Sequence, residues 1–135
     1  MALTGGGAGG FANTVNPSGT GSGINYVGNH AYAYSGNVSV DDAIKTLLQF
    51  NTQNNYVMAN IQMEYFDASS DNIKFVVKIN DEEVCVGIIT SRTDNWYNDL
   101  QVLIPPYSDV VVTGLNNSSS SARGVGVTLT GRNYA

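Results

Sequence analysis

The chain has 135 residues, of which 42% are hydrophobic and only 13% are charged, and its net charge at pH 7 is −5. This length predicts a single domain that can bury a core of its own. The acidic balance argues against nucleic acid and against an anionic membrane surface as partners, because both are bound by basic faces. No apolar run in the sequence approaches the length that a membrane span requires.

The first 24 residues are rich in glycine and carry no charged side chain; they read MALTGGGAGGFANTVNPSGTGSGI. Glycine loses more backbone entropy on ordering than any other residue, and this stretch has few apolar side chains to offset that loss. It also lacks the basic region and the continuous apolar stretch of a signal peptide.

We therefore predict an extended arm over residues 1–24, attached to a β-sandwich domain over residues 25–135. Such an arm is expected to become ordered on a neighbouring protein, either laid along its surface or added to a sheet as a strand. The alternative is a flexible linker that contacts no partner. The apolar residues that would anchor the arm are Phe11, Val15, Ile24 and Tyr26.

Residues 31–34 read AYAY, an alternation of small and aromatic side chains that predicts a strand, and a turn signal follows at Ser35-Gly36. The next apolar segment is ambiguous. Its helical spacing is carried by Val40, Ala43, Ile44, Leu47 and Leu48. The same segment is also compatible with a strand that has alternate residues on one face. The spacing favours a short helix over residues 40–48, and the strand remains the alternative.

From residue 56 onward, apolar and polar residues alternate with a period of two, which predicts half-buried strands. The predicted strands cover residues 56–66, 72–80, 83–90, 100–104, 109–115 and 124–132. The first three are expected to form an antiparallel meander. We therefore predict an all-β fold, an antiparallel β-sandwich whose favoured topology is a jelly roll, with at most one short helix.

The sequence offers no set of residues for catalysis, for a cofactor or for a metal ion. The single cysteine, Cys85, lies in an apolar run and is interpreted as a buried thiol, and nothing near it or near His30 indicates an activated pair. Residues 67–71 place oxygen atoms at alternate positions as a calcium loop does. The glycine and glutamate that such a loop requires are missing, so a polar hairpin turn is favoured. We predict that the protein is not an enzyme.

Residues 91–99 (SRTDNWYND) are predicted to form a polar loop around Trp96 and Tyr97. An aromatic pair beside Arg92, Asp94 and two asparagines is able to stack on a sugar ring, so a carbohydrate-binding module is an alternative function and a glycan an alternative partner. The competing interpretation is a loop that packs against a second copy of the chain.

Four stretches carry a resemblance to a known group of proteins; they are AYAYSGNVSV (residues 31–40), TLLQFNTQNNYVMANIQ (46–62), VLIPPYSDVVVTGLNN (102–117) and VTLTGRNY (127–134). In pattern and order, residues 30–135 resemble small β-sandwich virion proteins of tailed phages. Most members of that group are structural, decoration (cement) or head-associated proteins. In that group the TLLQF segment would be a strand, in conflict with the helical spacing.

The resemblance implies a place on the capsid surface of the virion, and an extracellular location once the particle is released. The arm would bind the major capsid protein or another virion protein, and the chain would self-associate, with a homotrimer as the expected form. The resemblance brings no catalytic residues. A further alternative is a subunit of an extracellular filament in which each copy donates its arm as a strand to the next.

Overall fold

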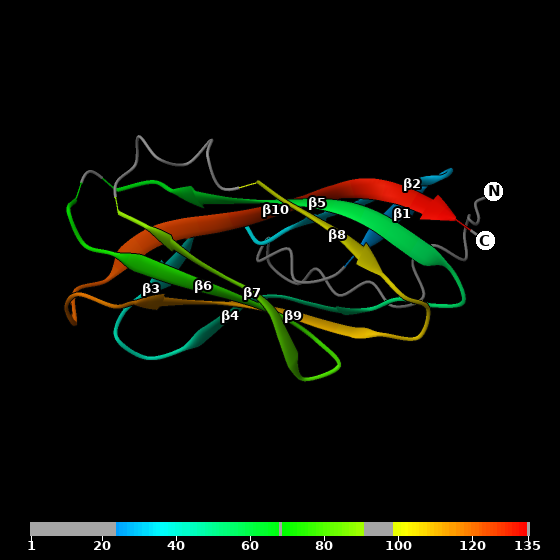
Figure 1. The fold of residues 1–135 in the computed structure, drawn as a ribbon. Coiled ribbons are helices and arrows are strands. Elements are labelled where there is room, and N and C mark those ends of the chain that lie inside the picture. Colours follow the sequence, from blue (N-terminus) through cyan, green and yellow to red (C-terminus); the bar gives the residue numbers. More distant parts are fainter. Residues whose placement is uncertain (1–23, 68, 91–98, 135) are drawn as a thin grey trace.

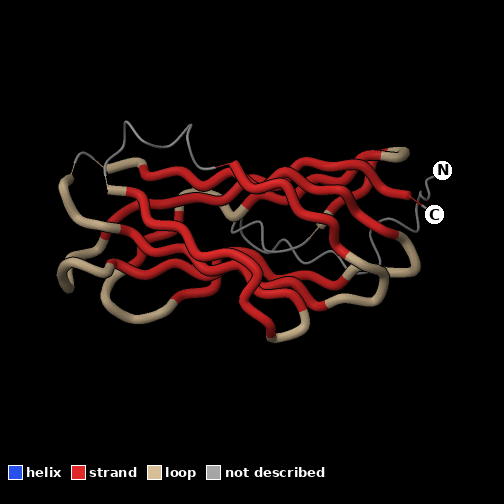
Figure 2. The backbone as a smooth tube through the Cα atoms, in the orientation of Figure 1, coloured by secondary structure: helices blue, strands red, loops and turns tan. Residues whose placement is uncertain are grey.

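A computed structural model describes residues 24–67, 69–90 and 99–134, in which every regular element is a β-strand (Figures 1 and 2). The ten strands are β1 (Asn25–Val27), β2 (His30–Tyr34), β3 (Val38–Val40), β4 (Lys45–Asn51), β5 (Tyr56–Tyr65), β6 (Ile73–Ile79), β7 (Glu82–Ile89), β8 (Asp99–Ile104), β9 (Asp109–Asn116) and β10 (Arg123–Tyr134). They form two antiparallel sheets packed against each other, which confirms the predicted all-β sandwich.

The larger sheet has the strand order β1-β2-β10-β5-β8, and β3 pairs with β10 beyond the end of β2. The smaller sheet has the order β4-β9-β6-β7. Four of the antiparallel pairs are nested in the sequence: β2 pairs with β10, β4 with β9, β5 with β8 and β6 with β7. The chain therefore folds as one long hairpin in which the strands of the first half pair with those of the second half in reverse order. The pairs β5–β10 and β6–β9 join these strand pairs into two sheets.

The core lies between the two sheets and is built by strict alternation along the strands. On β5, the buried residues are Val57, Ala59, Ile61, Met63 and Tyr65, while the intervening side chains face outward. β6 and β9 alternate in the same way. Burying one such large apolar side chain stabilises the fold by about 2 kcal/mol. The half-buried strands predicted for these three segments are confirmed.

The helix favoured over residues 40–48 is wrong. Val40 ends β3, a turn follows in which the Ala43 amide donates to Asp41 Oδ1 over 3.0 Å, and β4 then runs along the edge of the smaller sheet. The register between β4 and β9 shifts between Thr46 and Leu48, as at a β-bulge. Both Leu47 and Leu48 are buried at this bulge, so adjacent apolar residues imitate the spacing of a helix.

The predicted meander is only partly correct. β6 and β7 form a hairpin whose two turn residues, Asn80 and Asp81, have φ angles of 52° and 68°, as a tight two-residue turn requires. β5, however, lies in the larger sheet and β6 in the smaller one. Residues 66–72 therefore cross between the sheets and do not form the hairpin turn that was predicted. Alternation identifies the buried face of a strand, but both sheets bury the same kind of face, so it does not identify the neighbouring strand.

Candidate functional site

Two connections lie side by side at one end of the sandwich: the one between β4 and β5 and the one between β8 and β9. The buried Thr52 and Ser108 join them, because each backbone amide donates over 2.9 Å, one to the Ser108 carbonyl and the other to Thr52 Oγ1. The Thr52 hydroxyl donates to the Pro105 carbonyl over 2.7 Å. The Tyr107 amide donates to the Gln53 carbonyl, also over 2.7 Å. The two connections are thus fixed to each other by backbone and buried side-chain bonds.

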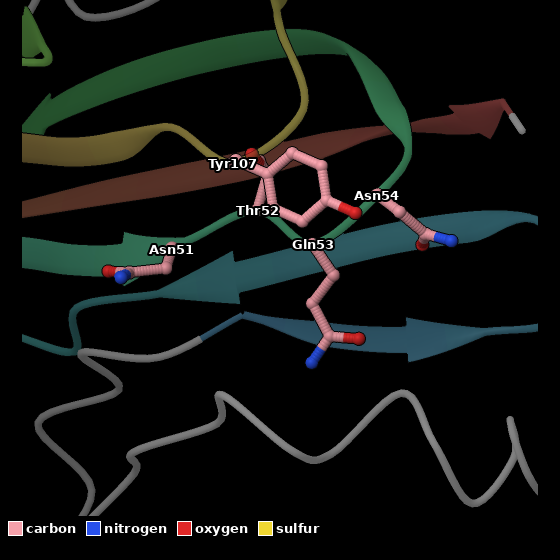
Figure 3. A pocket seen from close by; sticks show the side chains of 5 residues that line it. All are labelled: Asn51, Thr52, Gln53, Asn54 and Tyr107. Carbon is pink, nitrogen blue, oxygen red and sulfur yellow. The ribbon is translucent and has the colours of Figure 1, made fainter.

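This cross-bracing holds Tyr107 in an unusual conformation. Its φ is 55°, in the left-handed region that a bulky side chain rarely adopts. Its ring is 77% exposed and lies across the start of the β4–β5 connection, with three carboxamide side chains fanning outward around it (Figure 3). The pocket formed here has a volume of about 520 Å³. Its lining consists of Asn51, Thr52, Gln53, Asn54 and Tyr107, and we call it the Tyr107 pocket.

The lining of the Tyr107 pocket contains no ionised side chain and no residue type that serves as a strong nucleophile or base at neutral pH. Each carboxamide offers both hydrogen-bond donors and acceptors, and the tyrosine offers an apolar ring face with a polar end. The arrangement therefore fits recognition of a neutral polar molecule.

A second depression, of about 330 Å³, lies on the outer face of the larger sheet. Residues directly opposite one another, Tyr32, Thr130, Asn60 and Gln101, form one row across four strands. Arg132 and His30 flank that row, and the Arg132 guanidinium lies 5.9 Å from the centre of the Tyr134 ring. The depression lies on a sheet face, and all of its lining residues belong to β2, β5, β8 and β10.

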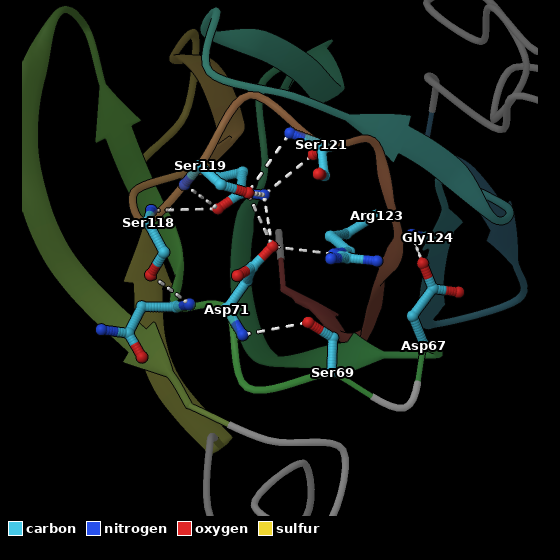
Figure 4. A network of polar contacts seen from close by, with 10 residues as sticks. Asp67, Ser69, Asp71, Ser118, Ser119, Ser121, Arg123 and Gly124 are labelled. Atoms are coloured by element: carbon cyan, nitrogen blue, oxygen red, sulfur yellow. Dashed lines mark hydrogen bonds and ion pairs between the residues drawn. The ribbon is translucent and has the colours of Figure 1, made fainter.

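The loop that resembles a calcium site has another role. The Asp71 carboxylate accepts hydrogen bonds from Arg123 Nε over 2.8 Å, from Ser119 Oγ over 2.9 Å and from Asn116 Nδ2 over 3.1 Å (Figure 4). Asp67 accepts from the Gly124 amide over 2.9 Å. These donors, Arg123 first, hold the pKa of Asp71 below its usual range. Both carboxylates are thus used to tie residues 66–72 to the β9–β10 connection, and among the described residues no group of three or more candidate ligands could hold a metal ion.

One edge of the smaller sheet exposes a row of apolar side chains. On β7 the outward-facing residues Val84, Val86 and Ile88 are 46%, 49% and 50% exposed. Directly opposite on β6, Lys74 and Val76 continue the same outer face. Large aliphatic side chains exposed in a row on an edge strand are a feature of surfaces that are covered by another protein.

The residues singled out from the sequence are only partly described by the structure. Phe11, Val15, Trp96 and Tyr97 lie outside the described residues. Ile24 is fully buried in this chain's own core, so it is not exposed to anchor a neighbour. Tyr26 lies on β1, packed against the core, and burial raises the pKa of its hydroxyl.

The thiol of Cys85 is partly buried on the core side of β7, whereas the exposed His30 belongs to the larger sheet. The Tyr107 pocket was not predicted. Two signals in the sequence pointed to it: the amide-rich run Asn51–Asn55, and a tyrosine directly after two prolines that end a strand.

Comparison of the sequence with models of protein families and with curated proteins finds no match. Within the part of the chain that the structure describes, no helix is long and apolar enough to cross a membrane.

Proposed function

We propose that this chain is a structural protein of a virus particle, a capsid decoration (cement) or other head-surface protein without catalytic activity. In this role the arm at residues 1–24 binds the major capsid protein or another virion protein, and the sandwich self-associates. The two-sheet antiparallel fold supports the proposal, because it is the architecture that the resemblance to phage virion proteins implies. The observation that carries it is the exposed apolar edge of β7.

The finer topology that we propose is a jelly roll. In that fold an eight-stranded hairpin is wrapped around an axis, so that strands far apart in the sequence pair in nested order. The nested pairs β2–β10, β4–β9, β5–β8 and β6–β7 support this topology, since they are the four pairs of such a hairpin. The short strands β1 and β3 are additions at the edge of the larger sheet.

β7 differs from the other sheet edges. β1 has only three residues, β4 carries a bulge beside Lys45, and β8 runs directly into two prolines. Short length, bulges, lysine and proline are the means by which proteins protect an edge from pairing with another chain. β7 is eight residues long, and its sequence EEVCVGII contains no lysine, arginine or proline. Its single register shift lies near its start, and Cys85–Ile89 continue in regular register.

The occupant that fits this edge is a second copy of the chain. Two β7 strands brought together by a twofold axis would present the same apolar row to each other, which makes the contact self-complementary. In a trimer, the exposed apolar side chains of β7 would instead contact a different surface of the next copy. In both arrangements the apolar side chains of β7 become buried, and a charge introduced there disfavours assembly.

The experiment is the mass of the protein in solution, measured by analytical ultracentrifugation over a range of concentrations. The wild type should form an oligomer, with the homotrimer as the expected form. Val86→Lys should shift the protein to monomers, because a lysine ammonium would have to be buried in the contact. Leu103→Lys is the matched control, since Leu103 is also 49% exposed but lies on β8 of the other sheet. This control should associate like the wild type.

A wild type that stays monomeric at its highest soluble concentration would contradict the proposal, as would equal effects of the two lysine variants. Electron microscopy of the purified wild type distinguishes the alternatives. Closed rings or compact trimers agree with a head-surface protein, whereas open helical arrays favour the filament subunit.

A further inference from the structure

We propose that the Tyr107 pocket is a binding site for a neutral saccharide. The pocket lies at the end of the sandwich where the β4–β5 and β8–β9 connections meet, and none of its lining residues belongs to β7. Binding there requires neither a second copy of the chain nor the loop at residues 91–99, for which a sugar-binding alternative was predicted from the sequence.

The ring of Tyr107 offers the ligand a flat apolar face. Its face is presented to solvent, and it stands on a backbone that is bonded on both sides of the pocket. Backbone conformations of low intrinsic stability persist where surrounding bonds enforce them, and they are concentrated at binding sites. A tyrosine loses few rotatable bonds on binding, so a ring already held in place gives contact area at a small entropic cost. Such a flat apolar face suits the carbon–hydrogen face of a sugar ring.

The carboxamide side chains beside the ring offer hydrogen bonds to the ligand. Asn51 ends β4, Gln53 and Asn54 follow it in the β4–β5 connection, and their carboxamides point outward in different directions beside the tyrosine (Figure 3). A sugar hydroxyl both donates and accepts, and a carboxamide answers with both functions from one planar group. Side chains that are already bonded elsewhere contribute less, and among the described residues Gln53 and Asn54 make no side-chain hydrogen bond. Their polar groups are therefore available to a ligand.

The charge of the pocket and its surroundings favours a neutral ligand. None of the five lining residues is ionised, and the residue directly opposite Asn51 on β9 is the acidic Asp109. Asp109 belongs to the same braced region, because its amide donates to Asn80 Oδ1 over 2.9 Å and its carbonyl accepts from the Asn80 amide over 2.8 Å. An anionic ligand would find no cation among the lining residues and the acidic Asp109 beside them. A neutral sugar carries no charge that the pocket would leave unpaired or repel. The volume of the pocket also lies within the range of small-molecule sites, about 300–1,000 Å³.

The test is isothermal titration calorimetry of the full chain with neutral oligosaccharides of glucose, galactose, mannose and N-acetylglucosamine, and with sialyllactose as an anionic sugar. At least one neutral oligosaccharide should bind saturably at millimolar or lower concentration, and sialyllactose should bind more weakly or not at all. Tyr107→Gly should weaken the binding about tenfold or more, because it removes the stacking ring. Tyr107→Phe, which keeps the ring, should retain most of the affinity.

Tyr107→Gly is chosen because glycine adopts a φ of 55° without strain, so the variant should keep the wild-type melting temperature. Tyr32→Ala is the matched control: Tyr32 is also exposed, but it lines the depression on the outer face of the larger sheet. Three results would each overturn the proposal: no neutral oligosaccharide binds, binding persists in Tyr107→Gly, or Tyr32→Ala and not Tyr107→Gly abolishes it. Equal affinity for sialyllactose would overturn the assignment to neutral sugars.

Discussion

Gly131 allows two neighbouring strands of the larger sheet to approach closely. It lies on β10 opposite Ala59 of β5, and a Cβ atom placed on it would collide with the carbonyl oxygen of Met58. The obstacle is backbone in the middle of a ten-residue pairing, so neither strand can move aside without breaking its ladder of hydrogen bonds. A side chain is therefore excluded at this one position for steric reasons.

Gly131→Ala should lower the free energy of unfolding by about 1–3 kcal/mol, the usual cost of forcing an extra carbon into a closely packed position. Gly87→Ala is the control, because a Cβ atom there would meet only Met63 Sδ at an ordinary distance of 3.9 Å. Alanine at Gly87 should be neutral or slightly stabilising. Urea unfolding of the two variants measures the difference, and equal destabilisation would show that the Met58 contact is not its cause.

The conformation of Tyr107 could not have been predicted from neighbouring residues. The two prolines before it indicate the end of a strand, and β8 does end at Ile104. Its positive φ depends on hydrogen bonds that the amides of Tyr107 and Ser108 donate to Gln53 and Thr52, and these acceptors lie more than fifty positions earlier in the chain. Propensity and periodicity describe only local sequence, so they miss a residue whose backbone is fixed by a distant segment.

At the scale of the elements, β4 shows how a bulge can misdirect sequence analysis. An uninterrupted strand buries every second residue, whereas the extra residue at Leu47 places two consecutive leucines in the core. The apolar spacing of three and four that results is the signature of an amphipathic helix. A bulge is stabilised by the partner strand, here β9, and it leaves no separate mark in the sequence of β4 itself.

The polar network around Asp71 connects two elements that the core does not join, namely the crossing between the sheets and the β9–β10 connection. Its stability should depend on pH. The pKa of Asp71 is lower in the folded protein than the usual value of about 3.9, so the network stabilises the fold above that pH. The contribution is lost as the pH falls through the lowered pKa of the folded state.

Asp71→Asn should therefore lower the melting temperature at pH 7, and the gap between variant and wild type should narrow in acid, below about pH 4. Asp42→Asn serves as the control at pH 7, because Asp42 is exposed and makes no hydrogen bond among the described residues. That control should melt close to the wild type. A gap that is constant down to pH 2 would show that the charge of Asp71 is not the source of the effect.

The boundary between arm and domain can be tested at Ile24. This residue is fully buried, and the buried hydrophobic residues of the described core run from Ile24 to Leu129. Deleting residues 1–23 should therefore leave the midpoint of urea unfolding unchanged. Ile24→Ala in the full chain should cost about 2–4 kcal/mol, as other buried isoleucines do. If the deletion unfolds the protein, residues before Ile24 belong to the core and the division of the chain is wrong.

For the whole molecule, sequence alone predicted β2 and the strands from β5 onward, but it missed β1, β3 and β4 and did not assign the strands to sheets. Alternation was sufficient for β5, β6 and β9, where every second residue is apolar. The passage from β5 in one sheet to β6 in the other depends on which strands pair across distances of up to a hundred residues. A pattern of period two carries no information on that choice.

The central position of β10 has a consequence for how the protein is made. β10 lies between β2 and β5 in the larger sheet, yet it follows both of them in the chain by more than fifty residues. While the polypeptide emerges from the ribosome, β2 and β5 have no partner between them until β10 has been synthesised. The larger sheet therefore closes late and through contacts between distant segments, which makes folding slow. During that interval the apolar faces of the waiting strands are open to aggregation or to a chaperone.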